Sequence, residues 1–416
     1  MRQVWMLALA QTFAQAGTII FITYGGILGA QLAPSAGLVT LPLALSVFGV
    51  AATSFPAAML MRSIGRRKAF ISSALLAGLS ALICAYSVAV QSFGGLCAAA
   101  VLFGSNMAFV QQYRFAAIDL VAPDQAAKAV ATVMVGPLAA ALLWPELGDR
   151  LRLIGGWPEF TGSFLVVAVL CLAAVVVLSQ LPAMTLTASD TRYASRPLRE
   201  ILGNTHCRVA IFAGICSYAV MSFIMTATPI SMHVIDALSV AETKRVISTH
   251  LVAMFLPSLF SGWLIQRFGL LRIMLAGVVC MTICVIGDTV AGHRFVHYLL
   301  SLALLGAGWN FLFVGGTTLL TGSYAPADRF RVQGINDLSV FGTQALASLL
   351  AGPAILYLGW GRLNLLTLPL LVLMAAAILR LQYLAPLGAD AQWNPGGAGH
   401  LDSTMRYLSS RSLWRR

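Results

Sequence analysis

Long apolar runs separated by short polar segments occupy almost the whole chain. Twelve of these runs contain about 20 or more residues each, enough for an α-helix to cross a hydrocarbon core roughly 30 Å thick. They lie near 4–28, 38–61, 69–90, 94–117, 128–149, 160–181, 208–232, 241–265, 272–291, 296–323, 330–357 and 363–385. Ser239 and Glu242 have the spacing of a capping box, which predicts the start of the eighth run as a helix. The pattern predicts an all-α membrane protein with twelve transmembrane helices.

Three short landmarks recur in the same order 202 to 204 residues later. They are Gly65 and Gly269, Ala122-Pro123-Asp124 and Ala325-Pro326-Ala327-Asp328, and the stretches 104–109 and 306–311. One nearly constant spacing is typical of two homologous halves in the same orientation. We therefore expect two six-helix bundles related by a pseudo-two-fold axis. The expected boundaries are a bundle at 1–181, a cytoplasmic linker at 182–207, a bundle at 208–385 and a mobile tail at 386–416.

Composition agrees with a lipid environment. Apolar residues make up 59% of the 416 positions and charged residues only 10%, whereas a soluble protein carries about 25% charged residues. The mean hydropathy is +0.86. The seven cysteines show no metal-ligand spacing, and no nucleotide-binding or hydrolase motif is present. We therefore expect no cofactor, no metal and no enzymatic activity.

The net charge of +12 follows the predicted topology. With both termini inside, the inner segments hold 20 Lys and Arg residues and the outer segments hold six. This bias predicts a multi-pass protein of a cell membrane, with a bacterial inner membrane favoured and both termini cytoplasmic. Because the basic residues are dispersed between apolar runs, they do not predict nucleic-acid binding.

The basic turn after the second run resembles a known family signature. That signature, Gly-x-Leu-x-Asp-Arg-x-Gly-Arg-Arg, belongs to the major facilitator superfamily and joins its helices 2 and 3. Leu60, Gly65, Arg66 and Arg67 match it, whereas Ala58, Arg62 and Ser63 depart from it. The second copy matches at Gly262, Leu264, Arg267 and Gly269, with Gln266 in place of the acid. The chain thus resembles a twelve-helix member of this superfamily over about residues 1–385.

The resemblance implies a secondary transporter in which two bundles rock about a central site. The gating turns would then contain Gly65, Arg66, Arg67, Arg267 and Gly269. In this interpretation the basic side chains latch one bundle to the other. The alternative is that these charges only enforce topology.

Polar residues on the apolar helices 1, 4, 7 and 10 are the candidates for the substrate pathway, because these helices line the cavity in the superfamily. The candidates are Gln11, Gln15, Asn106, Tyr113, Arg114, Tyr218, Ser222, Thr226, Trp309 and Asn310. The alternative for each residue is a hydrogen bond between helices. For Arg114 the alternatives are a substrate contact and an ion pair with Asp119.

Two intramembrane carboxylates are candidates for ion coupling. Glu146, on the fifth run after Pro145, can load a proton if it is partly buried; the alternative is a solvated helix end near Asp149. Asp337 on the eleventh run is the second candidate; its alternative is an ion pair with Arg329 or Arg331.

The sequence thus predicts a monomeric carrier of a small organic solute, driven by protons and surrounded by lipid. Aromatic and amide side chains favour a flat or amphipathic substrate that is neutral or anionic. Uptake of a nutrient such as a vitamin or siderophore competes with efflux of amphipathic toxic compounds. A transporter-like receptor is the remaining alternative.

Overall fold

The computed structural model describes residues 1–35, 38, 41–153, 156–183, 197–290 and 294–384. The described residues form helices and no strands, which confirms the all-α prediction. The expected tail at 386–416 and residues 184–196 of the expected linker lie outside the described residues. The last part of that linker is helical: α11 occupies Leu198–Gly203, and α12 starts at Thr205 because the Asn204 side chain accepts a hydrogen bond from the backbone N–H of His206.

The first half contains six spans. Their helices are α1 (Arg2–Ala14) with α2 (Ala16–Leu32), α3 (Leu41–Ile64), α4 (Arg66–Ala89), α5 (Phe93–Val110) with α6 (Tyr113–Asp119), α7 (Ala126–Val133) with α8 (Val135–Arg150), and α9 (Thr161–Ser179). A short 3₁₀ turn, η2 (Pro123–Gln125), precedes α7.

The second half repeats this order. Its helices are α12 (Thr205–Pro229), which continues as the π-helix η4 (Ile230–Ile235), α13 (Val240–Phe255) with α14 (Ser258–Phe268), α15 (Leu270–Val290), α16 (Phe295–Thr321), α17 (Arg329–Leu365) and α18 (Leu368–Leu384). The 3₁₀ turn η5 (Pro326–Asp328) precedes α17 at the position equivalent to η2. A capping box between Ser239 and Glu242 starts α13, as the sequence predicts.

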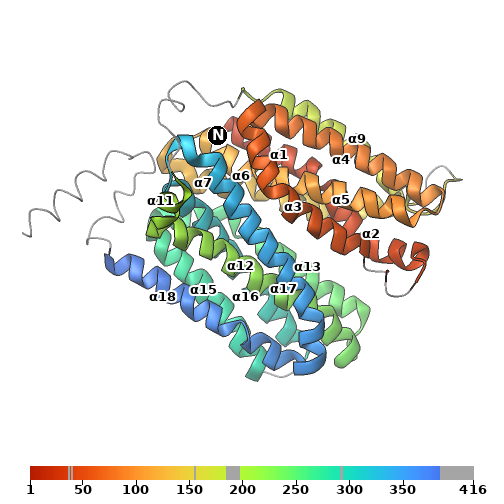
Figure 1. The fold of residues 1–416 in the computed structure, drawn as a ribbon. Helices are drawn as coiled ribbons and strands as arrows, with labels where there is room; N and C mark the ends of the chain where they lie inside the picture. The colour runs from red at the N-terminus through yellow and green to blue at the C-terminus, as the bar shows by residue number, and fades with distance from the viewer. Residues whose placement is uncertain (36–37, 39–40, 154–155, 184–196, 291–293, 385–416) are drawn as a thin grey trace, which may run out of the picture.

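The described residues contain ten helical segments that are long and apolar enough to cross a membrane, and the bent pair Arg245–Phe255 and Ser258–Phe268 makes an eleventh. The last segment, Pro326–Tyr383, has 58 residues. Gly359 has φ 74° within it, and there the chain turns back from α17 towards α18 (Figure 1). It therefore supplies two crossings, which gives the twelve that the sequence predicts.

The helices form two bundles that separate towards one end (Figure 1). The N-terminus, the start of α11 and the end of α18 lie together at the other end, which we call the linker side. One apolar core joins both bundles, since it contains Ala57 and Tyr113 from the first half and Trp309 and Phe330 from the second. Large apolar side chains such as Leu172 lie exposed on the outer surface, where they suit contact with lipid.

Both signature glycines adopt a backbone that favours glycine. Gly65 has φ 84° and Gly269 has φ 92°, so a side chain at either position would be strained. A Cβ atom on Gly269 would have no neighbour within 4 Å. At this turn the backbone angle, rather than close packing, therefore requires glycine.

Candidate functional site: a cavity between two bundles

A cavity of about 220 Å³ lies between the bundles. Gln11, Gln15 and Gln111 line it from the first half, and Tyr218 and Trp309 line it from the second. It opens away from the linker side. Along the first span the exposed fraction rises from 1% at Gln11 to 59% at Ile22, and both residues line the cavity.

Aromatic rings form one wall of the cavity. Tyr218 meets Trp309, Phe313 and Phe341 edge to face, with ring centroids 5.1 to 5.3 Å apart. Trp309 and Phe313 are stacked, with a centroid distance of 4.9 Å and an interplanar angle of 19°. The rings come from α12, α16 and α17, so the wall belongs to the second bundle. Such a wall suits a flat, conjugated molecule.

Aliphatic and uncharged polar side chains form the rest of the cavity lining. Every described side chain that lines the cavity is uncharged. Gln11 Oε1, Gln15 Oε1 and Trp309 Nε1 are buried and have no hydrogen-bond partner among the described residues. A buried polar atom without a partner is costly, so these atoms favour a ligand that donates and accepts hydrogen bonds.

Interrupted helices surround the cavity. Gln15 separates α1 from α2, and Met134 separates α7 from α8. Between α5 and α6 the turn tightens at Gln111 and Gln112, where the N–H of Gln112 donates to Phe109 O at 3.0 Å. In the second half, Phe255 ends α13 just before a bend of 43° at Pro257. Gln15, Gln111, Met134 and Phe255 all line the cavity, as expected of a site formed by discontinuous membrane helices.

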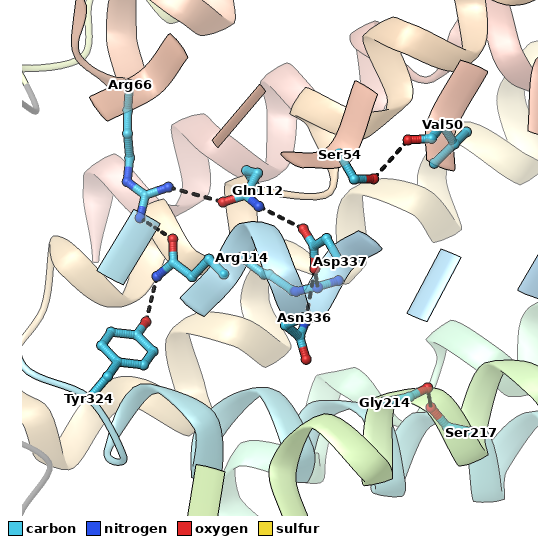
Figure 2. A network of polar contacts seen from close by, with 11 residues as sticks. Val50, Ser54, Arg66, Gln112, Arg114, Gly214, Ser217, Tyr324, Asn336 and Asp337 are labelled. Carbon is cyan, nitrogen blue, oxygen red and sulfur yellow. Dashed lines mark hydrogen bonds and ion pairs between the residues drawn. The ribbon is translucent and has the colours of Figure 1, made fainter. Parts of the chain in front are cut away.

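A buried polar network closes the linker side of the cavity (Figure 2). Arg114 and Gln112 from the first half both bind Asp337 on α17: Arg114 Nη2 donates to Oδ1 at 2.5 Å, and Gln112 Nε2 donates to Oδ2 at 2.6 Å. Asn336 Nδ2 also donates to Asp337 Oδ1, at 2.9 Å. The Arg114 and Asp337 side chains are completely buried. Because a buried charge without its partner costs about 3–5 kcal/mol, this ion pair ties the bundles together.

Arg66 forms the second part of the network. Its guanidinium pairs with Asp119 at 3.0 Å within the first bundle and donates to Gln333 Oε1 at 2.8 Å across the bundles. A longer bond of 3.4 Å to Gln112 Oε1 connects it to the Asp337 contacts (Figure 2). Arg329 on α17 approaches Asp119 at 3.6 Å from the opposite bundle. We call Arg66, Gln112, Arg114, Asp119, Gln333 and Asp337 the linker-side network.

Two glycines allow close contact between the bundles beside this network. A Cβ atom on Gly334 of α17 would lie 2.9 Å from Ala58 Cβ and 3.1 Å from Phe55 Cδ2, both on α3. A Cβ atom on Gly262 of α14 would lie 2.8 Å from Lys128 Cα on α7. At Gly262 the α14 backbone therefore lies against the α7 backbone, and at Gly334 the α17 backbone lies against side chains of α3.

Four of the ten predicted pathway residues line the cavity, namely Gln11, Gln15, Tyr218 and Trp309. The other six lie elsewhere. Asn106 donates to Ala14 O, Asn310 donates to Met254 O, Ser222 contacts Met221, Thr226 binds Ser348, Tyr113 packs on Phe70, and Arg114 belongs to the network. Most of these contacts are the hydrogen bonds between helices that the alternative interpretation describes.

The carboxylates considered for ion coupling differ in burial and in ion-pair partner. Glu146 lies at the end away from the linker, with its side chain 66% exposed and paired with Arg150 at 2.9 Å. The partial burial on which its predicted coupling role depends is therefore absent. Asp337 is buried and pairs with Arg114 rather than with Arg329 or Arg331. Asp119 pairs with Arg66 and not, as one alternative held, with Arg114.

Among the predicted basic gating residues, Arg66 makes a described contact across the bundles. Arg67 is half-buried and Arg267 is exposed at the end of α14. The sequence interpretation missed the role of Gln111, Phe341 and Gln344, which line the cavity. An amide pair inside an apolar run, Gln111-Gln112, was the available signal.

Comparison with known proteins places the fold and the site in context. The family model described as Major Facilitator Superfamily matches residues 210–414. The chain is 39% identical over 394 residues to the riboflavin transporter RfnT of Brucella anthropi, covering 94% of this chain and 98% of that protein. It is 28% identical to the uncharacterized MFS-type transporter YdeG of Bacillus subtilis, over 89% of this chain and 91% of that one.

Solved structures share the same architecture. The fucose:proton symporter FucP of E. coli has a TM-score of 0.72 at 13% identity, over 93% of this chain and 98% of that one. The human organic anion transporter MFSD10 has a TM-score of 0.73 at 15% identity, over 91% and 99% of the two chains. At these identities the likeness concerns the fold.

Proposed function

Because this chain belongs to the major facilitator superfamily and is a multi-pass membrane transporter, we propose that it carries riboflavin into the cell by alternating access. The observation that carries this proposal is the pairing of an aromatic wall with uncharged amides in one cavity between the bundles. The similarity to RfnT along nearly the whole chain supports the same substrate.

Riboflavin carries a flat ring and hydrogen-bond donors that complement the side chains lining this cavity. Its flat ring system can stack on the Trp309 and Phe313 wall, in the way that nucleobases stack on aromatic side chains. Its imide N–H and the hydroxyls of its side chain can donate to Gln11 Oε1 and Gln15 Oε1. The cavity is smaller than the roughly 300–1,000 Å³ of closed ligand pockets, so the bundles would enclose the hydroxylated chain only as the open end closes around the whole molecule.

Removal of the stacking surface tests the substrate. In vesicles that contain the purified chain, Trp309→Leu should raise the half-saturating riboflavin concentration about tenfold, since a stacked ring contributes about 1–3 kcal/mol. The matched control is Trp263→Leu, because Trp263 is 60% exposed on α14 and does not line the cavity. Riboflavin uptake that is equal in both variants would contradict the proposed stacking. Movement of riboflavin out of the cell would favour efflux instead.

The proposed cycle starts from the arrangement that the structure describes. The linker-side network holds the bundles together on one side while the cavity opens on the other. With the linker in the cytoplasm, this is an outward-facing carrier. Riboflavin would bind the cavity, the network would part, and the cavity would then open inwards.

We further propose a cytoplasmic linker and cytoplasmic termini in the bacterial inner membrane. The basic residues of the linker-side segments support this orientation. In whole cells that express a variant without the native cysteines, Leu153→Cys should react with an impermeant thiol reagent and Lys68→Cys should not. Both side chains are exposed, and they lie at opposite ends of the molecule. A difference in labelling would therefore report the side of the membrane rather than a difference in exposure. Labelling at Lys68 in place of Leu153 would reverse the proposed orientation.

Proton coupling would pass through Asp337, and a single chain would be the transporting unit. Asp337 is buried at the contact between the bundles, so a change in its charge acts where the bundles must part. One chain supplies both bundles that line the cavity, so the proposed site needs no second copy to complete it.

A further inference from the structure

The electrostatics of the cavity bear on which flavins it can bind. Cells contain riboflavin and its phosphorylated forms, flavin mononucleotide and flavin adenine dinucleotide, which share one ring system. A phosphate monoester carries a charge of about −1.5 to −2 at pH 7. Stacking on Trp309 cannot make the cavity prefer one of these flavins, because the ring system is the same in each. Selection must therefore come from the groups that meet the rest of the molecule.

The described lining of the cavity offers no positive charge to a phosphate. Its polar members include Gln11, Gln15, Gln111 and Gln344, all of them neutral amides. Among the buried lining atoms without a described partner, Gln11 Oε1 and Gln15 Oε1 are acceptors and Trp309 Nε1 is an uncharged donor. Acceptor oxygens attract hydroxyl and imide donors and repel phosphate oxygens.

A buried cation lies behind the aromatic wall. The Arg114 guanidinium is 4.4 Å from the centre of the Phe313 ring, and Phe313 lines the cavity. The Arg114 side chain is completely buried and its charge is balanced by Asp337 at 2.5 Å. Arg114 Nε and Nη1 have no partner among the described residues, but Arg114 does not line the cavity, so a phosphate could reach these donors only past the Phe313 ring.

We infer that the cavity selects the uncharged vitamin and rejects flavins that carry phosphate. This inference rests on the proposed riboflavin transport and narrows it from neutral or anionic substrates to neutral ones. A phosphorylated flavin would have to leave water without a compensating cation. The cell would then keep its own phosphorylated flavins even when the cavity opens inwards, and riboflavin phosphorylation after uptake would trap the vitamin.

Competition measures this selectivity directly. Vesicles that contain the purified chain take up radiolabelled riboflavin in the presence of unlabelled riboflavin, flavin mononucleotide or lumichrome, the neutral ring without its hydroxylated chain. Flavin mononucleotide should need a concentration at least about 100-fold higher than riboflavin for half-inhibition, because its charge is buried without a partner. Lumichrome should compete better than flavin mononucleotide, since it keeps the ring and lacks the charge.

A charge placed in the cavity provides the matched comparison. Gln344 is half-buried and lies one turn beyond Phe341 towards the open end. Gln344→Arg should lower the ratio of half-inhibiting concentrations, flavin mononucleotide to riboflavin, by at least about tenfold, since a charged partner is now available. Gln344→Met, of similar size and without charge, should leave this ratio unchanged.

The outcomes separate this inference from the proposed function. Equal competition by flavin mononucleotide and riboflavin would overturn the selectivity and leave riboflavin transport standing. An unchanged ratio in Gln344→Arg would also overturn it, because charge in the cavity would then not decide selection. Absence of riboflavin uptake by the native chain would overturn the proposed function and the inference together.

Discussion

Asp337→Asn should abolish the accumulation of riboflavin against its gradient. The variant leaves the buried Arg114 guanidinium without its counter-ion across the bundles. Such a loss costs about 3–5 kcal/mol, which is enough to shift the population of the closed linker side more than 100-fold. It also removes the carboxylate that we propose as the proton carrier. Uptake driven by an imposed pH gradient, compared with exchange at equal pH, measures both effects.

The charge-neutral double variant separates the two roles of Asp337. Arg114→Gln with Asp337→Asn removes both charges, so no buried charge is left unpaired. If Asp337 carries the coupled proton, the double variant should regain downhill exchange of riboflavin but not accumulation. Recovery of accumulation would show a purely structural ion pair. Normal accumulation by Asp337→Asn alone would rule out both roles.

Other polar groups around Asp337 set the conditions for this coupling. Gln112 donates to Asp337 Oδ2 and Asn336 donates to Asp337 Oδ1. Arg66 does not contact Asp337 directly, but it donates to Gln112 Oε1 and so connects to Asp337 through Gln112. Tyr218 from α12 packs against Phe313, whose ring centre lies 4.4 Å from the Arg114 guanidinium, and Tyr218 also lines the cavity. A proton that arrives through the cavity would therefore reach Asp337 past Tyr218, which connects the substrate site to the network.

Gly334→Leu should prevent the linker side from closing and thereby stop transport. A Cβ atom alone would lie 2.9 Å from Ala58 Cβ, so a leucine must push α17 away from α3. Overpacking of this kind costs about 1–3 kcal/mol and would favour the state that is open on the linker side. Spin labels at Lys68 and Arg272, both exposed at the linker side on opposite bundles, should move apart.

Gly342→Leu on the same helix is the matched control. A Cβ atom at Gly342 would have no neighbour within 4 Å, so its extra side chain meets open space. The spin-label distance should then stay at its native value. Gly262→Leu should repeat the Gly334 effect, because its Cβ would lie 2.8 Å from Lys128 Cα. Native distances in both Gly334→Leu and Gly262→Leu would contradict a gate that depends on glycine at these close contacts.

The fold could be predicted from the sequence because lipid imposes strong local rules. Each span needs about 20 apolar residues, and these runs are visible without any knowledge of contacts. The turns at Gly65 and Gly269 were also visible, since their positive φ values require glycine at both positions. The capping box at Ser239 and Glu242 was visible because capping joins residues three apart.

The candidate site was only partly predictable, because polar residues within apolar helices have two possible uses. Gln11 and Gln15 line the cavity, whereas the side-chain amides of Asn106 and Asn310 donate hydrogen bonds to backbone carbonyls of neighbouring helices. No local pattern separates these uses, since each residue lies in an apolar run. Glu146 illustrates the same limit: its place on helix 5 was visible, but its exposure was not.

The sequence by itself determined the twelve spans, the duplication and the basic turns, since each depends on neighbours along the chain. The tertiary structure decided which polar groups meet. Arg66 binds Gln333 across a separation of 267 residues, and Gln112 binds Asp337 across 225. Such contacts depend on how the two bundles rotate and tilt against each other. That geometry arises from packing summed over whole helices, so no single stretch of sequence encodes it.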